Sequence, residues 1–218
     1  MIRGLLFDLD GVLVDTAKYH FLAWQRMASA LGIPFGHKEN EQLKGVSRRE
    51  SLERILAWGK LTLPEPEMQH WMDLKNQWYL EYVAHMDPQE VLPGVRSFLA
   101  DARAQGYLIG LGSASKNAIP LLKKVDLFSY FDAIVDGHVV TESKPHPAVF
   151  LEGAKLLALL PEQCVVFEDA VAGVEAAKRG GMRCIGMGRQ EELPLADKVI
   201  SGFENQTVSG LLAGLSLL

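Results

Sequence analysis

Short apolar runs alternate with helical patterns through most of this 218-residue chain. Six runs have the length and composition of buried strands: 2–7, 108–112, 133–135, 165–167, 184–186 and, more weakly, 198–200. Helical patterns separate them at 95–105, 118–125, 147–159 and 171–179. Strands that alternate with helices form a parallel sheet with helices on its faces. We therefore predict an α/β fold with a Rossmann-like parallel sheet as its core.

One stretch, residues 15–87, breaks the alternation because it shows no strand pattern. Apolar residues recur there at helical spacing in three groups: Phe21, Trp24, Ala28 and Leu31; Leu52, Ile55 and Leu56; Trp71, Leu74, Trp78 and Tyr82. A capping-box pattern at Ser47–Glu50 places one helix start near Ser47. We predict a small α-helical cap domain at 15–87, inserted into a core domain of residues 1–14 and 88–218.

Composition narrows the class of partner and the compartment. The chain is 48% hydrophobic and 22% charged, as expected of a globular protein. Its formal charge of −5 argues against nucleic acid or an anionic membrane as main partner. No apolar run approaches the roughly 20 residues that span a bilayer. Cys164 and Cys184 lie in apolar runs, which indicates buried thiols. We expect a cytoplasmic protein with no signal peptide.

Polar residues follow four of the expected strands. They are Asp8 with Asp10, the segment 113–117, Lys144, and Glu168 with Asp169. Because ligands bind at the carboxyl ends of strands in an open α/β sheet, the fold would gather these residues at one edge.

The four acids of this set, Asp8, Asp10, Glu168 and Asp169, form a hard-oxygen cluster of the kind that binds Mg²⁺. Glu168 and Asp169 also precede a helix and therefore suit a capping role. Ser113 ends a strand, so its hydroxyl and the amides after it suit either a helix cap or a phosphate cradle. Opposite four acids, Lys144 is best interpreted as a balance for nucleophile and phosphate charge.

Together, the Asp8-Leu9-Asp10-Gly11-Val12 segment, Ser113, Lys144 and the Glu168-Asp169 pair resemble the four ordered motifs of the haloacid dehalogenase (HAD) superfamily. The helical insertion after the first strand resembles members with a small helical cap. The resemblance covers the whole chain and implies a HAD-like fold.

The resemblance implies phosphoryl transfer through an aspartyl phosphate. Asp8 would be the nucleophile and Asp10 the acid and base. Ser113, Lys144 and nearby backbone amides, including that of Ala114, would stabilise the oxygens in transfer. Dehalogenases of the superfamily lack the second aspartate, so Asp10 favours a phosphatase or a mutase.

The resemblance also implies one Mg²⁺ per subunit. Its ligands would be the Asp8 carboxylate, the Asp10 carbonyl, Asp169 and Glu168.

Cap residues resemble, more specifically, those of the β-phosphoglucomutase family. The resemblance rests on the segment 44–48, on the Lys75-Asn76 pair and on single positions around them. It implies the following substrate-binding set: Thr16, His20, Trp24, Gly45, Val46, Arg48, Ser51, Lys75, Ala114, Ser115, Lys116 and Asn117. The prolines within 61–67 depart from the family pattern and indicate a rearranged cap loop.

Such a mutase interconverts β-glucose 1-phosphate and glucose 6-phosphate, with β-glucose 1,6-bisphosphate as intermediate and primer. The intermediate carries two phosphates, so a second anion site is required away from the metal. Arg48, at the start of a capped helix, offers a planar fork and a positive helix end for it. In the family, His20 and Lys75 couple sugar binding to the placement of Asp10. For Trp24, two roles stay open: packing in the core of the cap and contact with the sugar.

Three functions remain open to this sequence. A mutase acting on small hexose phosphates, as a monomer, is our main expectation. The alternative is a HAD-type sugar-phosphate phosphatase that passes the same phosphoryl group to water. A non-catalytic sugar-phosphate sensor is the third, and the presence of both Asp8 and Asp10 argues against it.

Overall fold

A six-stranded parallel sheet forms the core of the computed structural model, which describes residues 1–215. Its strand order is β3-β2-β1-β4-β5-β6. The strands are β1 (Gly4–Phe7), β2 (Leu108–Gly112), β3 (Ala133–Val135), β4 (Cys164–Glu168), β5 (Arg183–Met187) and β6 (Lys198–Ile200). All neighbouring pairs are parallel. The α/β fold and all six expected strands are confirmed.

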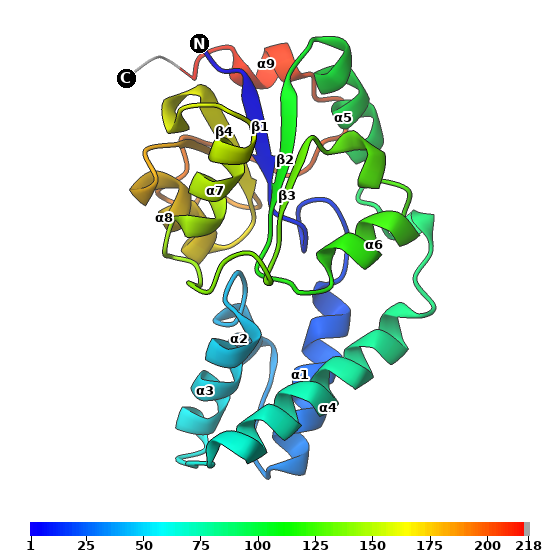
Figure 1. The fold of residues 1–218 in the computed structure, drawn as a ribbon, viewed down its shortest axis with the longest axis vertical. Coiled ribbons are helices and arrows are strands. Elements are labelled where there is room, and N and C mark those ends of the chain that lie inside the picture. Colours follow the sequence, from blue (N-terminus) through cyan, green and yellow to red (C-terminus); the bar gives the residue numbers. More distant parts are fainter. Residues whose placement is uncertain (216–218) are drawn as a thin grey trace.

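Helices cover both faces of this sheet (Figure 1). They are α5 (Val95–Ala104), α6 (Ala118–Lys124), α7 (Ala148–Leu156), α8 (Val171–Arg179) and α9 (Val208–Leu212), with single 3₁₀ turns at Pro88–Glu90, Phe128–Tyr130 and Pro161–Gln163. Side chains alternate along β1, as the pleat requires. Leu5 and Phe7 pack with α5, α6 and α9, whereas Leu6 packs with α7 and α8.

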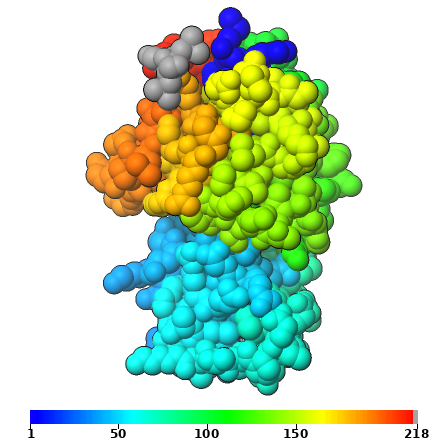
Figure 2. Space-filling model, turned by 60° about the vertical axis from the view of Figure 1, so that its left-hand side comes forward, coloured from blue at the N-terminus to red at the C-terminus, as the bar shows by residue number. Residues whose placement is uncertain are grey.

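Four helices lie between β1 and β2 in sequence: α1 (Ala17–Ala30), α2 (His37–Glu41), α3 (Arg48–Trp58) and α4 (Glu65–Val83). They form the helical segment at the carboxyl end of the sheet, drawn at the bottom of Figure 1. In the space-filling view, its blue and cyan atoms lie below the green, yellow and orange atoms of the later part of the chain (Figure 2). The expected cap-type insertion is confirmed.

Some details differ from the sequence expectations. The helix expected at 147–159 ends at Leu156, since Ala158 adopts a left-handed conformation with φ of 55° that turns the chain towards β4. The expected loop at 61–67 is partly helical, because Pro64 and Pro66 lie at the start of α4, where proline is tolerated. The five-residue helices α2 and α9 were not expected, since they are too short for a periodic signal.

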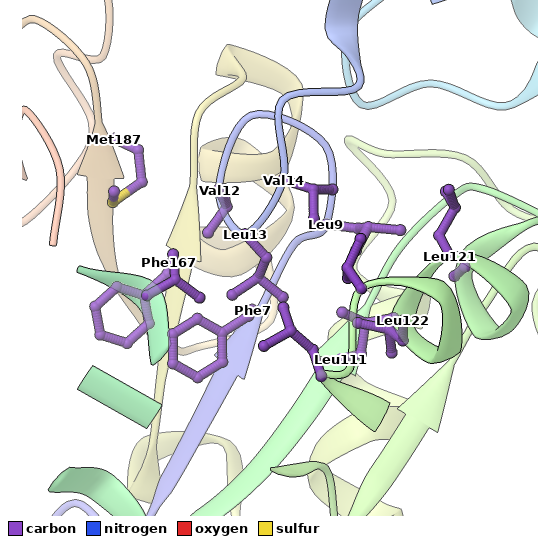
Figure 3. Packing of buried hydrophobic residues seen from close by; sticks show 14 of the residues in the cluster. Phe7, Leu9, Val12, Leu13, Val14, Leu111, Leu121, Leu122, Phe167 and Met187 are labelled. Carbon is purple, nitrogen blue, oxygen red and sulfur yellow. The ribbon is translucent and has the colours of Figure 1, made fainter. Parts of the chain in front are cut away.

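Buried aromatic rings anchor β1 and β4 to α5. Phe7 and Phe167 stack with their ring centroids 4.6 Å apart, and Phe98 lies 4.7 Å from Phe203. Towards the carboxyl ends, the apolar packing continues through Leu9, Val12, Leu13, Val14 and Met187 (Figure 3). The chain that leaves β1 is therefore held in place by its apolar side chains, which pack in the core. Within residues 1–215, no helix is long and apolar enough to cross a membrane.

The Phe98→Ala variant tests this anchoring. Phe98 is 1% exposed and contacts three other phenylalanine rings. Its truncation should lower the free energy of unfolding by about 3–5 kcal/mol, measured by urea titration. Phe128 is 40% exposed, and Phe128→Ala should change the same quantity by no more than about 0.5 kcal/mol. Similar losses in both variants would contradict the packing described.

Candidate active site

The first loop of the site follows β1. Asp8 is buried, and its amide donates to Phe167 O at 3.0 Å, which ties the loop to β4. Gly11 has a φ of +83°, and a Cβ there would lie 2.4 Å from Asp169 Oδ2. Only glycine allows this backbone to turn so close to a carboxylate. The turn leaves Asp8 and Asp10 at the carboxyl edge of the sheet.

The second loop follows β4, whose last residue is Glu168, and begins with Asp169. Glu168 is fully buried under α8, where a Cβ on Gly173 would overlap its Oε1. Its Oε2 accepts a hydrogen bond from the amide of Ala170 at 2.7 Å. Helix α8 therefore begins directly over the carboxylate of Glu168.

Lys144 joins these two loops. Its Nζ lies 2.5 Å from Asp8 Oδ1 and 2.6 Å from Glu168 Oε1, and the side chain is 1% exposed. Burial alone would lower the pKa of Lys144, but the charges of Asp8 and Glu168 outweigh burial and raise it. The ammonium is therefore charged and fixed beside the carboxylate of Asp8.

Asp169 is the least compensated acid of the site. Burial, with Glu168 and Asp8 nearby, raises its pKa well above the usual range. Its salt-bridge partner is Lys44 of the helical segment, at 3.7 Å. A buried carboxylate in this position fits a bound cation, because a cation would remove the cost of ionising it.

The oxygen donors therefore suit Mg²⁺ in their chemistry. Within residues 1–215, no three His, Cys, Asp or Glu side chains are arranged as a metal cluster. Both oxygens of Glu168 are engaged, one by Lys144 and the other by the amide of Ala170. Asp8 and Asp169, by contrast, line the cavity described next.

A cavity of about 570 Å³ lies between this edge and the helical segment. Nearly all expected site residues line it: Asp8, Asp10, His20, Trp24, Gly45, Val46, Arg48, Ser51, Lys75, Ser113, Ala114, Ser115, Lys116, Asn117, Lys144 and Asp169. Thr16 and Glu168 are absent from this lining. Both are fully buried. Thr16 donates to the carboxylate of Asp10, and Glu168 accepts from Lys144, so each contacts a residue that lines the cavity.

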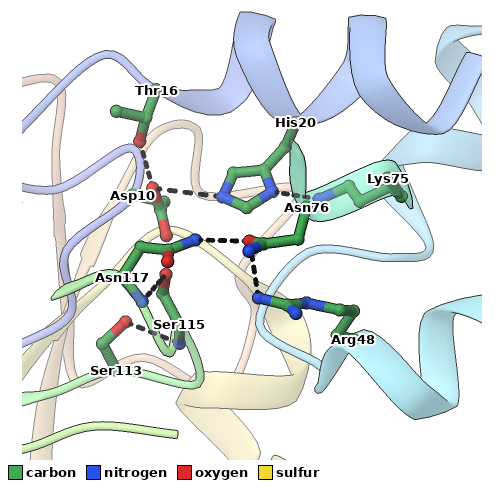
Figure 4. Close-up of polar contacts among 9 residues, drawn as sticks. All are labelled: Asp10, Thr16, His20, Arg48, Lys75, Asn76, Ser113, Ser115 and Asn117. Carbon is green, nitrogen blue, oxygen red and sulfur yellow. Dashed lines mark hydrogen bonds and ion pairs between the residues drawn. The ribbon is translucent and has the colours of Figure 1, made fainter. Parts of the chain in front are cut away.

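Asp10 is held from the side of α1. The Thr16 hydroxyl donates to Asp10 Oδ1, and His20 Nε2 lies 3.7 Å from the same oxygen. Lys75 of α4 reaches His20 Nδ1 at 3.0 Å, so that Lys75, His20 and Asp10 form a row (Figure 4). Only a quarter of the Asp10 side chain is exposed, towards the cavity.

Burial shifts the pKa values of all three residues in this row. Burial and the charge of Asp8 raise the pKa of Asp10 to about 6. Burial, with Lys75 and Arg48, lowers the pKa of His20 well below its usual range, so the ring is neutral. Burial and Arg48 lower the pKa of Lys75 to about 7. An aspartate with a pKa near 6 is a far better proton donor at neutral pH than an ordinary one.

The end of the cavity where α3, α4 and the start of α6 meet, the far end from Lys144, carries the positive charge of Arg48. Arg48 Nη2 donates to Asn76 Oδ1 at 2.8 Å, and Asn117 Nδ2 donates to the same oxygen at 2.9 Å (Figure 4). Arg48 lies at the start of α3, where the Ser47 hydroxyl accepts from Glu50 N as the capping pattern predicts. Ser51 supports this turn through a 2.9 Å bond to Ser47 O.

The helical segment also contacts the sheet edge directly. The amide of Ser47 donates to Ser143 Oγ at 3.2 Å. A Cβ on Gly45 would lie 3.3 Å from Ala170 Cβ. The segment 44–47 thus packs against the residues beside Lys144 and Asp169, which closes the cavity on this side.

Asn76 entered the sequence interpretation only through the resemblance of the Lys75-Asn76 pair, and no role was predicted for it or for Ser143. Asn76 stands beside Lys75 in a helix, and neither its type nor its spacing indicates the two donors that it meets. Ser143 precedes Lys144, and its contact with Ser47 joins residues 96 positions apart. Trp24 is 4% exposed yet lines the cavity, and the Lys75 ammonium lies 4.4 Å from its ring centroid.

Comparison with known proteins agrees with this geometry. The model of the haloacid dehalogenase-like hydrolase family matches residues 2–181. The chain belongs to this family. Its order of strands and its helical insertion are therefore family features, and the expected superfamily membership is confirmed.

Individual family members are similar over nearly the whole chain. β-Phosphoglucomutase of Bacillus subtilis is 40% identical over 201 residues, which cover 91% of this chain and 89% of that protein. A crystal structure of β-phosphoglucomutase from Clostridium difficile matches with a TM-score of 0.95 and 39% identity, over 98% of this chain and 96% of that one. Hexitol phosphatase B of Escherichia coli K12 is 31% identical over 220 residues, 97% of each chain.

The Lys144→Met variant tests the buried ion pairs. It leaves Asp8 and Glu168 without their shared cation, and it should lower the free energy of unfolding by about 3–5 kcal/mol at pH 8. Adding Glu168→Gln removes one of the two charges and should restore part of that loss. Urea unfolding measures both. Unchanged stability in the single variant would show that these contacts contribute nothing to folding.

The Lys75→Met variant tests the buried ammonium. Folding lowers the pKa of Lys75 from 10.5 to about 7. The folded protein therefore binds this proton more weakly than the unfolded chain, a penalty that is complete below pH 7 and fades as the pH rises towards 10.5. Methionine should raise the unfolding temperature at pH 7, by roughly 2–4 °C per kcal/mol relieved, and less at pH 9.5. If calorimetry finds the same change in unfolding temperature at both pH values, the lowered pKa of Lys75 is ruled out.

Proposed function

We propose that the chain is a β-phosphoglucomutase that interconverts β-glucose 1-phosphate and glucose 6-phosphate by way of β-glucose 1,6-bisphosphate. The observation that carries the proposal is the presence of anion-suited groups at both ends of one cavity. Lys144 and Ser113 lie beside Asp8, and Arg48 and Asn117 lie at the far end. The similarity to two β-phosphoglucomutases supports the same assignment.

In the proposed reaction, a carboxylate oxygen of Asp8 forms a bond to phosphorus as the bond from phosphorus to the sugar oxygen breaks. Asp10, with a pKa of about 6, gives its proton to that leaving oxygen. The bisphosphate that gives its 1-phosphoryl group to Asp8 in this way leaves as glucose 6-phosphate. Asp10 then takes a proton from the 6-hydroxyl of an incoming β-glucose 1-phosphate, whose oxygen bonds to phosphorus as the bond from phosphorus to Asp8 breaks, so that the 1,6-bisphosphate forms again. Lys144 and Ser113 stabilise the phosphoryl oxygens during both steps.

The carboxylates of Asp8 and Asp169 and the carbonyl of Asp10 would hold one Mg²⁺. The ion would supply positive charge to offset that of the phosphoryl group in transfer. Glu168 acts through Lys144, to which it is bonded. The assignment explains why Asp169 is buried with so little compensating charge.

The far end of the cavity has a separate task in this proposal. One phosphate of the bisphosphate must be held while the other reacts, and Arg48 and Asn117 supply donors for it. Ser115 and Lys116 also line the cavity. We infer that residues 15–87 act as a cap over the core domain of residues 1–14 and 88–218. Contact of segment 44–47 with Ser143 would help to exclude water from the phosphorylated Asp8.

A sugar-phosphate phosphatase is the second candidate, and the similarity to hexitol phosphatase B favours it. The two candidates differ in the acceptor of the phosphoryl group. Given β-glucose 1-phosphate, Mg²⁺ and a trace of the 1,6-bisphosphate, the protein should form mainly glucose 6-phosphate. Free phosphate as the dominant product would overturn the mutase proposal in favour of the phosphatase.

The Arg48→Ala variant tests the second anion site. Loss of a charge-assisted contact to a phosphate should lower mutase kcat/KM by at least about tenfold. Hydrolysis of a small ester such as p-nitrophenyl phosphate, which does not reach the far end, should change by less than about twofold by the same reasoning. Arg54 lies on the same helix and pairs with Glu50 at 2.5 Å, so Arg54→Ala is the matched control. Equal loss of both activities in Arg48→Ala would refute the site.

A further inference from the structure

Asn76 of α4 lies behind the cavity wall, where its side-chain oxygen accepts two hydrogen bonds at once. One donor is the Arg48 guanidinium from α3, and the other is the Asn117 amide at the start of α6 (Figure 4). Arginine has no acceptor, so the atom of Asn76 that faces it must be the oxygen. Asn117 must then present its amide nitrogen to the same atom. The orientation of both carboxamides follows from this one constraint.

The contact joins the helical segment to the sheet. Arg48 and Asn76 belong to the segment between β1 and β2, whereas Asn117 follows β2. Asn117 N donates to Ser115 Oγ at 3.2 Å, and Ser115 N donates to Ser113 Oγ at 3.1 Å. A continuous row of hydrogen bonds thus runs from Arg48 to the loop beside Asp8.

The acceptor is neutral, which sets Arg48 apart from its neighbours on α3. Arg49 pairs with Glu53 and Glu65, and Arg54 pairs with Glu50. Arg48 forms no salt bridge with any of residues 1–215 and is held by a carboxamide. Its guanidinium is therefore positioned without a direct ion pair, and its other N–H groups are left for an anion.

We propose that Asn76 is a positioning residue that holds Arg48 and Asn117 as a preformed pair of donors for the phosphate of the substrate that is not reacting. The inference rests on the proposed second anion site and extends it to a residue that does not touch the cavity. Both donors keep further N–H groups while bonded to Asn76, so the contact persists when phosphate binds. A neutral side chain is required because a carboxylate would satisfy Arg48 itself.

Binding of glucose 6-phosphate, measured by calorimetry in the presence of Mg²⁺, tests this role. Asn76→Ala should weaken binding about tenfold, the equivalent of one hydrogen bond to a charged group. Asn76→Asp keeps the acceptor and the shape but adds a charge, and it should weaken binding more than Asn76→Ala. Gln77, the exposed neighbour that bonds only Glu81, is the control, and Gln77→Ala should bind as the wild type does. A dissociation constant of Asn76→Asp or Asn76→Ala equal to that of the wild type would overturn the proposal.

A double-mutant cycle gives the second test. Because Asn76 acts through Asn117 and Arg48, Asn76→Ala combined with Asn117→Ala should bind no more than about twofold more weakly than the poorer single variant. Losses that multiply would contradict a shared role. This outcome is separable from the proposed function: a wild type that releases mainly free phosphate refutes the mutase, whereas the cycle reports only on phosphate binding.

Discussion

The active edge of this protein depends on one buried cation. Lys144 lies between Asp8 and Glu168, and its ammonium offsets the cost of burying these two carboxylates. The contact requires β1 and β4 to be neighbours, because Asp8 follows one strand and Glu168 ends the other. The strand order, the glycine that lets α8 cover Glu168 and the phenylalanine cluster beneath the loops all serve this arrangement.

Charge is then distributed unevenly along the cavity. Near Asp8 and Asp169 the acids outnumber the cations, which suits a metal and a phosphoryl group together. At the far end, Arg48 is held only by a neutral acceptor. Between them, the row of Lys75, His20 and Asp10 holds a proton donor with a pKa of about 6. One cavity therefore offers a site for a metal with a phosphoryl group at one end, a positive charge for an anion at the other, and a proton donor between them.

The sequence predicted most of the fold, because its strands are short, apolar and separated by clear helical periods. The Asp8-to-Val12 segment and Glu168-Asp169 were predictable as partners because both follow strands of one parallel sheet. Contacts between side chains distant in sequence were not predictable. Neither residue type nor spacing indicates that Asn76 receives two donors, or that both oxygens of Glu168 are engaged by Lys144 and Ala170. The short helices α2 and α9 lack a periodic signal.

In the proposed reaction, Asp8 accepts a phosphoryl group and returns it to a sugar and not to water. The most direct test is to load the protein with labelled phosphate from β-glucose 1,6-bisphosphate and then to add unlabelled β-glucose 1-phosphate. We expect a labelled phosphoenzyme that is absent from Asp8→Ala and whose label passes into sugar phosphates. Label that appears mainly as inorganic phosphate, or a phosphoenzyme that forms equally well in Asp8→Ala, would contradict it.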